Sequence, residues 1–192
     1  MWYFFRHGQT IHNIYKVSQG RYNSSLSLKG IDQAKFCAYK IQDLEENLQE
    51  YIFLTSPMFR AKQTINIIME LLNIDPFNYL KEEELLNDIN FGDHNNVSNK
   101  IVWANYVEDN NILYCQHKNG ECFNDVYNRI ELFLHKYKDI DNLIFATHGC
   151  CFAILKHILM GNKRSDFIRN NLIQNQNYLI KYDNNSKILE LI

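Results

Sequence analysis

Short apolar runs alternate along the chain with longer segments whose apolar positions recur every three or four residues. The short runs lie at residues 1–5, 51–54, 143–146, 178–182 and 188–191, and their length predicts buried β-strands. The longer segments cover residues 27–47, 59–73, 121–138 and 151–160, and their spacing predicts helices. This alternation predicts an α/β fold with a mixed, mainly parallel sheet and helices on both faces.

Residues typical of element boundaries support this pattern. They are a helix N-cap at Ser27, a strand stop at Pro57, a helix C-cap at Gly161 and a hairpin turn at residues 183–186. Residues 11–21 lack helical spacing, so we expect an ordered loop there. Residues 93–119 are the least periodic part of the chain, although Trp103 and Tyr106 allow a short helix.

Composition narrows the class of protein. The length of 192 residues and a hydrophobic content of 46% predict one globular domain spanning residues 1–192. Twenty basic and 22 acidic side chains nearly balance, which argues against a nucleic-acid or membrane-surface partner. The first apolar run is too short for a signal peptide or membrane span, so we expect a cytoplasmic protein. Five cysteines without CxxC spacing predict reduced thiols.

Polar residues of one chemical kind follow three of the predicted strands. These residues are Arg6-His7, Thr55-Ser56 leading to Arg60, and Thr147-His148. Ligands bind at the carboxyl ends of strands in open α/β sheets. If the three strands are neighbours, two arginines and two histidines converge on one pocket. Such a pocket suits a phosphoryl group, because arginines neutralise its oxygens and an uncharged imidazole can attack phosphorus without a metal.

Each of these residues also has a purely structural interpretation. Arg6 and His7 could form a solvated loop pair, and His148 could be a packed, hydrogen-bonded histidine. Arg60 lies in the first turn of a helix, where a positive charge is unfavourable, so it either extends to solvent or lies near an anion. The remaining histidines lack metal-ligand spacing, and we expect surface or structural roles for His12, His94, His117, His135 and His157. Solvated side chains are expected for Arg129, Arg164 and Arg169.

Several sequence blocks together resemble the histidine phosphatase (phosphoglycerate mutase-like) superfamily. In order they are RHGQT with Asn13, QGR at 19–21, SSLSLKG ending at Gly30, TSPMFRAKQT at 55–64, LNDINFG at 86–92, GECFNDV at 120–126 and THG at 147–149. The resemblance implies a three-layer α/β/α sandwich with a mixed, mainly parallel central sheet. It also implies two-step phosphoryl transfer through a phosphohistidine, with no cofactor and no metal.

The resemblance also implies roles for individual residues. His7 would be the nucleophile, and Arg6, Arg60 and His148 would hold the transferred phosphoryl group. Asp88 lies where the family usually has a glutamate that protonates the leaving oxygen. The matching segments imply phosphate or substrate binding by Asn13, Gln19, Gly20, Arg21 and Gly149.

Three departures from the family pattern affect this assignment. Aspartate is one methylene shorter than glutamate, about 1.5 Å of reach, so Glu84 and Asp93 stay open as alternatives to Asp88. Cys122 replaces the serine of the family's GES block, and a thiol is a weaker donor to phosphate. Cys150 and Cys151 follow His148-Gly149, where they alter pocket size more than chemistry.

The resemblance leaves the reaction open. The family's mutases carry a basic insertion and a C-terminal tail, whereas residues 92–120 contain no arginine and two lysines, Lys100 and Lys118. We therefore predict a phosphomonoesterase acting on a small organic phosphate, with a phosphoprotein as the alternative substrate, and as a monomer or homodimer. The alternatives are a mutase, or a member that binds a phosphorylated ligand without turnover. Loop aromatics would suit an apolar or planar leaving group, and these are Tyr15, Tyr22, Trp103 and Tyr106.

Overall fold

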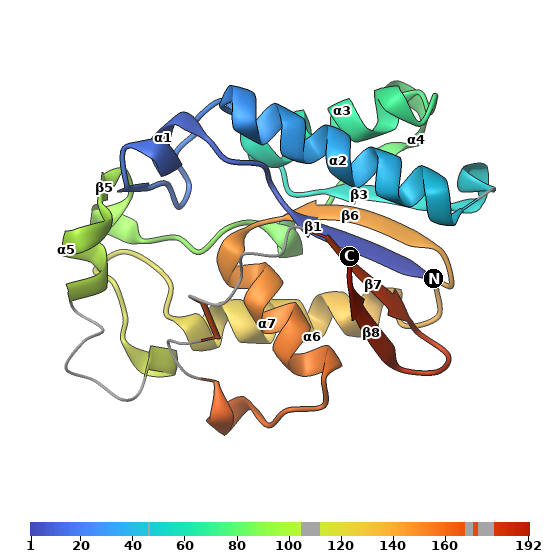
Figure 1. Ribbon diagram of the computed structural model, residues 1–192. Coiled ribbons are helices and arrows are strands. Elements are labelled where there is room, and N and C mark those ends of the chain that lie inside the picture. The colour runs from blue at the N-terminus through green and yellow to red at the C-terminus, as the bar shows by residue number, and fades with distance from the viewer. Residues whose placement is uncertain (46, 105–111, 168–170, 173–178) are drawn as a thin grey trace.

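A mixed sheet forms the centre of the molecule (Figure 1). The computed structural model describes residues 1–192 apart from 46, 105–111, 168–170 and 173–178. Within these residues the central sheet has six strands in the order β4-β3-β6-β1-β7-β8. Their bounds are Trp2–Arg6 (β1), Ile52–Thr55 (β3), Leu80–Glu82 (β4), Leu143–Thr147 (β6), Leu179–Asp183 (β7) and Ile188–Leu191 (β8). Strands β4, β3, β6 and β1 pair in parallel, β7 pairs antiparallel with β1, and β8 pairs antiparallel with β7. This confirms the predicted mixed, mainly parallel sheet.

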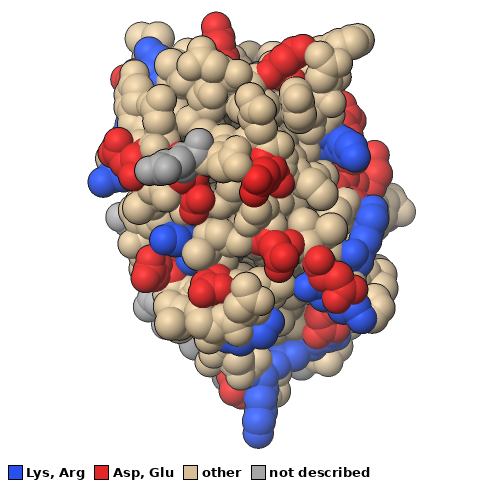
Figure 2. Space-filling view, turned by 90° about the vertical axis from the view of Figure 1, so that its right-hand side faces the viewer, with Lys and Arg blue, Asp and Glu red and all other residues tan. Residues whose placement is uncertain are grey.

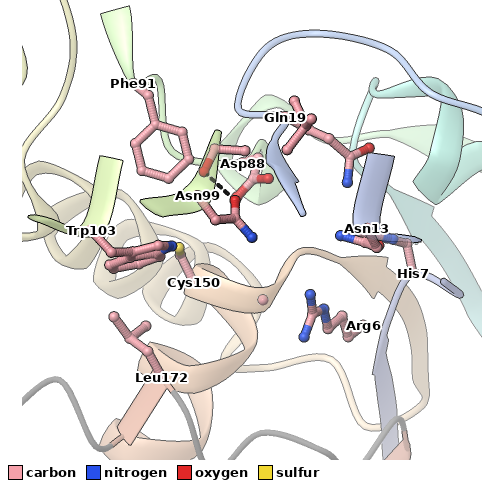
Figure 3. A pocket seen from close by; sticks show the side chains of 13 residues that line it. Arg6, His7, Asn13, Gln19, Asp88, Phe91, Asn99, Trp103, Cys150 and Leu172 are labelled. Atoms are coloured by element: carbon pink, nitrogen blue, oxygen red, sulfur yellow. Dashed lines mark hydrogen bonds between the residues drawn. The ribbon is translucent and has the colours of Figure 1, made fainter. Parts of the chain in front are cut away.

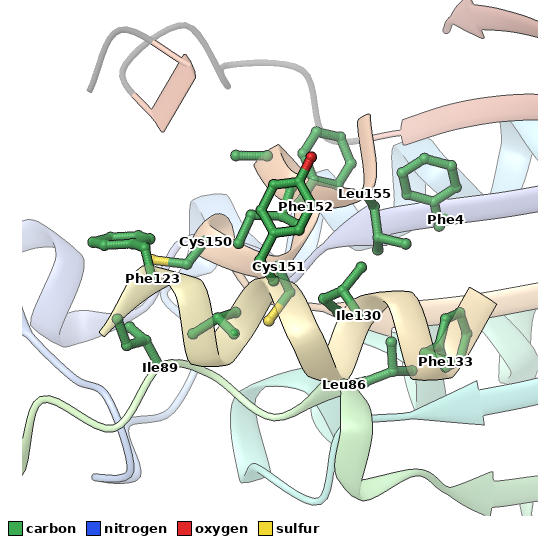
Figure 4. Close-up of a cluster of buried hydrophobic side chains, with 14 of the residues drawn as sticks. Phe4, Leu86, Ile89, Phe123, Ile130, Phe133, Cys150, Cys151, Phe152 and Leu155 are labelled. Atoms are coloured by element: carbon green, nitrogen blue, oxygen red, sulfur yellow. The ribbon is translucent and has the colours of Figure 1, made fainter. Parts of the chain in front are cut away.

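Helices cover both faces of this sheet (Figure 1). Helices α2 (Leu28–Leu44) and α3 (Phe59–Leu71) lie on one face, and α6 (Phe123–Tyr137) and α7 (Gly149–Leu159) lie on the other. Two separate apolar clusters fill the spaces between the layers. Figure 4 shows the cluster under α6 and α7, where Phe4 of the sheet packs with Phe133 and Phe152. The three-layer α/β/α architecture is therefore confirmed.

The predicted helices form where their apolar positions can be buried. Helix α2 begins at the expected cap, because the Ser27 side chain accepts a hydrogen bond from the Gly30 amide. Helix α6 buries one face, which includes Val126, Ile130 and Phe133. The predicted bounds differ from the observed ones by up to three residues, most at the end of α2.

Several short elements were not predicted. The expected loop at 11–21 contains helix α1 (Ile11–Ile14) and strand β2 (Val17–Ser18), so that prediction was wrong. Strand β2 pairs with β5 (Val97–Ser98) in a separate two-stranded sheet. Elements of two to four residues have no measurable period, which is why the hydrophobic pattern missed them. The other short elements are α4 (Pro76–Tyr79), β4, and 3₁₀ turns at Leu48–Glu50, Glu84–Leu86, Gly92–His94, Ile112–Tyr114 and Arg164–Asp166.

The aperiodic middle segment contains the short helix that Trp103 and Tyr106 allowed. Helix α5 (Asn99–Ala104) includes Trp103. Tyr106, Arg169 and Tyr178 lie outside the described residues. Acidic and basic side chains are interspersed with uncharged ones on the face seen in Figure 2. Among the described residues, no helix combines the length and the apolar character that crossing a bilayer requires.

Candidate active site

The three polar strand ends meet at one edge of the sheet. Strand β6 lies between β1 and β3, with Arg6 opposite Thr147 and Thr55 opposite Ala146. This arrangement meets the condition under which the two arginines and two histidines converge. A cavity of about 170 Å³ lies at this edge (Figure 3). Arg6, His7, Asn13, Gln19 and Gly149 form its polar side.

His7 lines this cavity and presents a defined nitrogen to it. Its Nδ1 lies 2.8 Å from the carbonyl oxygen of Gly8. Because a carbonyl only accepts hydrogen bonds, Nδ1 carries the proton and Nε2 of the neutral ring keeps its lone pair. Burial lowers the pKa of His7 well below its usual value, and the nearby Arg60 and Arg6 guanidinium groups lower it further. The ring is therefore neutral at pH 7 and suited to nucleophilic attack.

Arg6 supplies an available positive charge. Figure 3 shows its guanidinium group pointing into the cavity, and within the described part of the chain it has no hydrogen-bond or ion-pair partner. Gly149 makes room for it: a Cβ atom there would lie 3.2 Å from Cζ of Arg6. Gly149 also begins helix α7, whose first amide groups carry partial positive charge. This side of the cavity is suited to an anion.

Two amide side chains complete the polar side. Asn13 belongs to a capping box. Its side-chain Oδ1 accepts a hydrogen bond from the backbone N–H of Thr10, and its backbone N–H donates to Thr10 Oγ1. This leaves the Asn13 Nδ2 group as a donor directed toward the cavity (Figure 3). Gln19 is buried, and its Oε1 atom has no hydrogen-bond partner.

Asp88 and Arg60 form a buried ion pair behind the cavity. Asp88 lines the cavity, and its Oδ2 atom accepts a hydrogen bond of 2.7 Å from Arg60 Nη2. Arg60 is fully buried and also donates to the carbonyl oxygens of Gly20 and Tyr22. Its Nε atom has no partner. A positive charge in the first turn of a helix was expected either to lie near an anion or to extend to solvent. Arg60 does not extend to solvent, and the anion beside it is Asp88 of the protein itself.

His148 lies beside this ion pair. Its Nδ1 atom is 3.7 Å from Asp88 Oδ2 and has no hydrogen-bond partner, while Nε2 lies 2.7 Å from Ser56 Oγ. The rings of His148 and His7 are 5.3 Å apart between centroids. Burial lowers the pKa of His148 well below its usual value, and the Arg60 guanidinium contributes. The structure thus brings His148 to the predicted cluster without exposing it to solvent.

Of the predicted binding residues, Gly20 supports the site from behind, whereas Arg21 points to another partner. Gly20 has a φ of +51°, and a Cβ atom there would lie 1.9 Å from Asn95 Oδ1. Its carbonyl oxygen holds Arg60, so Gly20 supports the site through the arginine. Arg21 lies 3.8 Å from Glu121. Neither Gly20 nor Arg21 lines the cavity in the described part of the chain.

The alternative acids are less well placed than Asp88. Glu84 is exposed and accepts a hydrogen bond from Asn87. Asp93 lies on the surface with Lys118 and Asn119 as partners. Asp88 is therefore the acid that lines the cavity among these three.

The opposite side of the cavity was largely missed from sequence. Its apolar residues are Phe91, Trp103 and Leu172, with Asn99 and Cys150 between the two sides (Figure 3). Val17 and Ser18 also line the cavity. Trp103 alone had been considered, as a loop aromatic, and Cys150 as a determinant of pocket size. Tyr15 and Tyr22 are exposed and lie elsewhere. Ser18 and Asn99 gave no signal, because the β2–β5 pairing that brings their segments together carries no sequence period.

Two predictions, those of solvated Arg129 and Arg164, need correction, whereas those for the histidines and the paired cysteines agree with the structure. Arg129 is largely buried, since it donates to Glu121 and to the Leu85 carbonyl oxygen. Arg164 is half-buried over the Tyr127 ring. His117 and His157 are buried, which leaves only the structural role for them. Cys122 caps helix α6 and donates to Asp125. Cys150 and Cys151 lie in the first turn of helix α7 as expected, and burial raises the pKa of both thiols.

In the part of the chain that the structure describes, no group of three His, Cys, Asp or Glu side chains is arranged so that it could hold a metal ion. The metal-free and cofactor-free mechanism stays a prediction.

Comparison with solved structures supports the fold. A putative alpha-ribazole-5'-P phosphatase from Escherichia coli superposes with a TM-score of 0.76 and 20% identity, covering 100% of this chain and 93% of that one. A mycobacterial glucosyl-3-phosphoglycerate phosphatase in complex with VO3 gives a TM-score of 0.74 and 18% identity, covering 100% and 96%. At these identities the likeness shows a shared fold.

Sequence comparison assigns the family. Fructose-2,6-bisphosphatase of Saccharomyces cerevisiae is 25% identical over 162 residues, which are 80% of this chain and 33% of that protein. This chain thus spans about a third of the length of that relative. A family model described as the histidine phosphatase superfamily (branch 1) matches residues 2–192. With His7 and His148 at adjacent strand ends, the chain belongs to branch 1 of the histidine phosphatase superfamily.

Proposed function

We propose that the protein is a cofactor-independent phosphomonoesterase that hydrolyses a small organic phosphate through a phosphohistidine on His7. The observation that carries this proposal is the pairing of two groups in one cavity. The unpartnered Arg6 guanidinium lies on the same side as the unprotonated Nε2 of His7. A cation that holds a phosphoryl oxygen and a neutral nitrogen that attacks phosphorus are the two main requirements of the first step.

In the first step, His7 Nε2 forms a bond to phosphorus while the ester P–O bond breaks. Arg6, Asn13 and the amide groups at the start of helix α7 would hold the phosphoryl oxygens. Asp88 lies on the cavity wall, and in its protonated form, with its ion pair to Arg60 released, it would give a proton to the leaving oxygen. In the second step, water attacks phosphorus and gives its proton to Asp88, and the P–N bond breaks to release phosphate.

The apolar side of the cavity bears on the leaving group. Phe91 and Trp103 meet edge to face with their centroids 6.3 Å apart, and Leu172 lies beside them (Figure 3). Apart from Arg6 and Asp88, no charged residue lines the cavity in the described part of the chain. These features favour an uncharged leaving group with an apolar or planar face.

The decisive experiment is hydrolysis of a panel of phosphomonoesters in the presence of chelator, with the His7→Ala variant measured alongside. We expect the wild type to cleave phosphomonoesters with aryl or uncharged alkyl leaving groups and the variant to cleave none. Acid quench should trap a phosphoenzyme only in the wild type. Turnover by His7→Ala at the wild-type rate would place the nucleophile elsewhere, and a strong loss with chelator would contradict the metal-free mechanism.

A panel without hydrolysis would separate the two alternative functions. Conversion of 2- to 3-phosphoglycerate after priming with a bisphosphate would indicate a mutase. Vanadate binding without any product from any ester would indicate a member that binds phosphorylated ligands without turnover.

A further inference from the structure

Ser56 lies directly behind His148 and takes part in a hydrogen-bond chain that ends on a carboxylate. The chain runs from His148 through Ser56 and Asn87 to Glu84. All of its members except Glu84 are buried. Ser56 itself is fully buried and does not line the cavity in the described part of the chain. Ser56 therefore reaches the site through its neighbours, and the one among them that carries a titratable ring is His148.

The direction of each hydrogen bond follows from the carboxylate. An ionised carboxylate only accepts, so the group of Asn87 that faces Glu84 is its Nδ2 donor. The Oδ1 atom of Asn87 consequently faces Ser56, at 3.1 Å, and receives the single hydroxyl proton of Ser56. Ser56 Oγ can then only accept from its other neighbours, which are the Met58 amide at 3.3 Å and His148 Nε2 at 2.7 Å.

We propose that Ser56 fixes His148 in the tautomer with its proton on Nε2, so that a tetrahedral dianion binds beside His148 only with uptake of a second proton on Nδ1. The inference rests on the proposed function, since it assumes that the phosphoryl group sits by His7. In the neutral ring, Nδ1 presents a lone pair toward Asp88 Oδ2 at 3.7 Å. A lone pair there repels an incoming anion, whereas an N–H at the same position attracts it.

The balance of charge supports this proton uptake independently. Asp88 and Arg60 neutralise each other, which leaves Arg6 as the one unpaired cation of the cavity lining in the described part of the chain. A dianion therefore exceeds the available positive charge by one. Protonation of His148 removes that excess and satisfies its otherwise unpartnered Nδ1.

The charged groups around His148 act in opposing directions. The cations that oppose its protonation in the free protein are Arg60, Arg129 and Arg21, together with the nearby ring of His7. Asp88 faces Nδ1 from the opposite side and favours the proton. The buried thiols of Cys150 and Cys151 stay protonated near neutral pH, because burial raises their pKa. The added anion supplies the negative charge that turns this balance toward the imidazolium.

The test is to count protons when sulfate binds, because sulfate is a tetrahedral dianion with no titratable proton near neutral pH. Calorimetric titrations in two buffers of different ionisation enthalpy, at about pH 7.5, give the number directly. We expect uptake of about one proton per bound sulfate in the wild type. Ser56→Ala should lower this number clearly below the wild-type value, because the freed ring can place its single proton on Nδ1 and face the anion without a second proton.

Two further variants keep the result interpretable. Ser56→Thr retains a hydroxyl and should restore uptake of about one proton. Ser24→Ala removes another buried hydroxyl, one that does not belong to the hydrogen-bond chain, and should leave the number of protons taken up unchanged. An unchanged number in Ser56→Ala would place the proton on His7 or Asp88 and overturn the proposal, as would sulfate binding without uptake in the wild type. Ester hydrolysis tests the proposed function separately, so the two failures are distinguishable.

Discussion

Replacing Asp88 by asparagine should separate its chemical role from its structural one. Asparagine is nearly the same size and keeps an oxygen that can accept from Arg60, but it cannot donate a proton to a leaving oxygen. Removal of the whole side chain is a worse test. Arg60 is fully buried, so Asp88→Ala would leave an uncompensated charge and destabilise the fold by about 3–5 kcal/mol. Asp88→Asn keeps part of that hydrogen bonding, and its thermal stability should fall less.

The expected effect depends on the leaving group. A positioned general acid contributes roughly 10²–10⁴-fold, which corresponds to about 2.7–5.4 kcal/mol of transition-state stabilisation at ~1.36 kcal/mol per tenfold. An alkyl phosphate should lose this amount in kcat/KM, because its alkoxide leaves only with a proton. p-Nitrophenyl phosphate should lose less than about tenfold, since nitrophenolate leaves without one.

The assay is kcat/KM for both esters in wild type and variant, at equal folded fractions checked by thermal unfolding. Asp93→Asn is the matched control, because Asp93 is a surface acid with partners outside the cavity. Equal losses for the two esters would refute the assignment of Asp88 as the general acid. They would mean that the variant disturbs Arg60 or the phosphoryl site instead.

Three more outcomes follow from the site. Burial and the two arginines lower the pKa of His7, so the neutral nucleophile persists as pH falls, and kcat/KM for an aryl phosphate should decline only well below pH 6.5; a decline centred at or above pH 6.5 would contradict this. Gly149→Ala should displace the Arg6 guanidinium and weaken phosphate inhibition while unfolding stays near wild type. Trp103→Ala should raise the activation free energy of kcat/KM by about 1–3 kcal/mol more for aryl esters than for glycerol phosphate. Leu132→Ala, at an exposed site on α6, is the control.

The sequence predicted the parts of the site that lie on regular elements. Strand β1 is an unbroken apolar run, so the position of Arg6 and His7 at its end followed from length alone. The same holds for His148 after β6. The spacing of apolar residues does not show which strands are neighbours, so it could not show that β6 lies between β1 and β3. The convergence of the two arginines and two histidines therefore stayed conditional until the strand order was known.

The rest depended on contacts between distant segments. Asn99 enters the cavity because β5 pairs with β2, and two paired residues in each strand leave no pattern. The burial of Arg129 follows from its contacts with Glu121 and the Leu85 carbonyl, which are eight and 44 positions away. A charged residue on an amphipathic helix gives no sign of such partners, and the default expectation of a solvated side chain was wrong.

The Arg60–Asp88 pair links the acid to the phosphoryl site. Arg60 is buried behind the cavity, and its Nη atoms donate to the carbonyl oxygens of Gly20 and Tyr22 and to Asp88. When Asp88 carries the proton destined for the leaving oxygen, it no longer neutralises Arg60, and the guanidinium charge then acts on the nearby phosphoryl group. Proton transfer to the leaving group restores the ion pair and weakens that hold. In the proposed mechanism, the residue that assists departure thereby also controls how much positive charge the phosphoryl group meets.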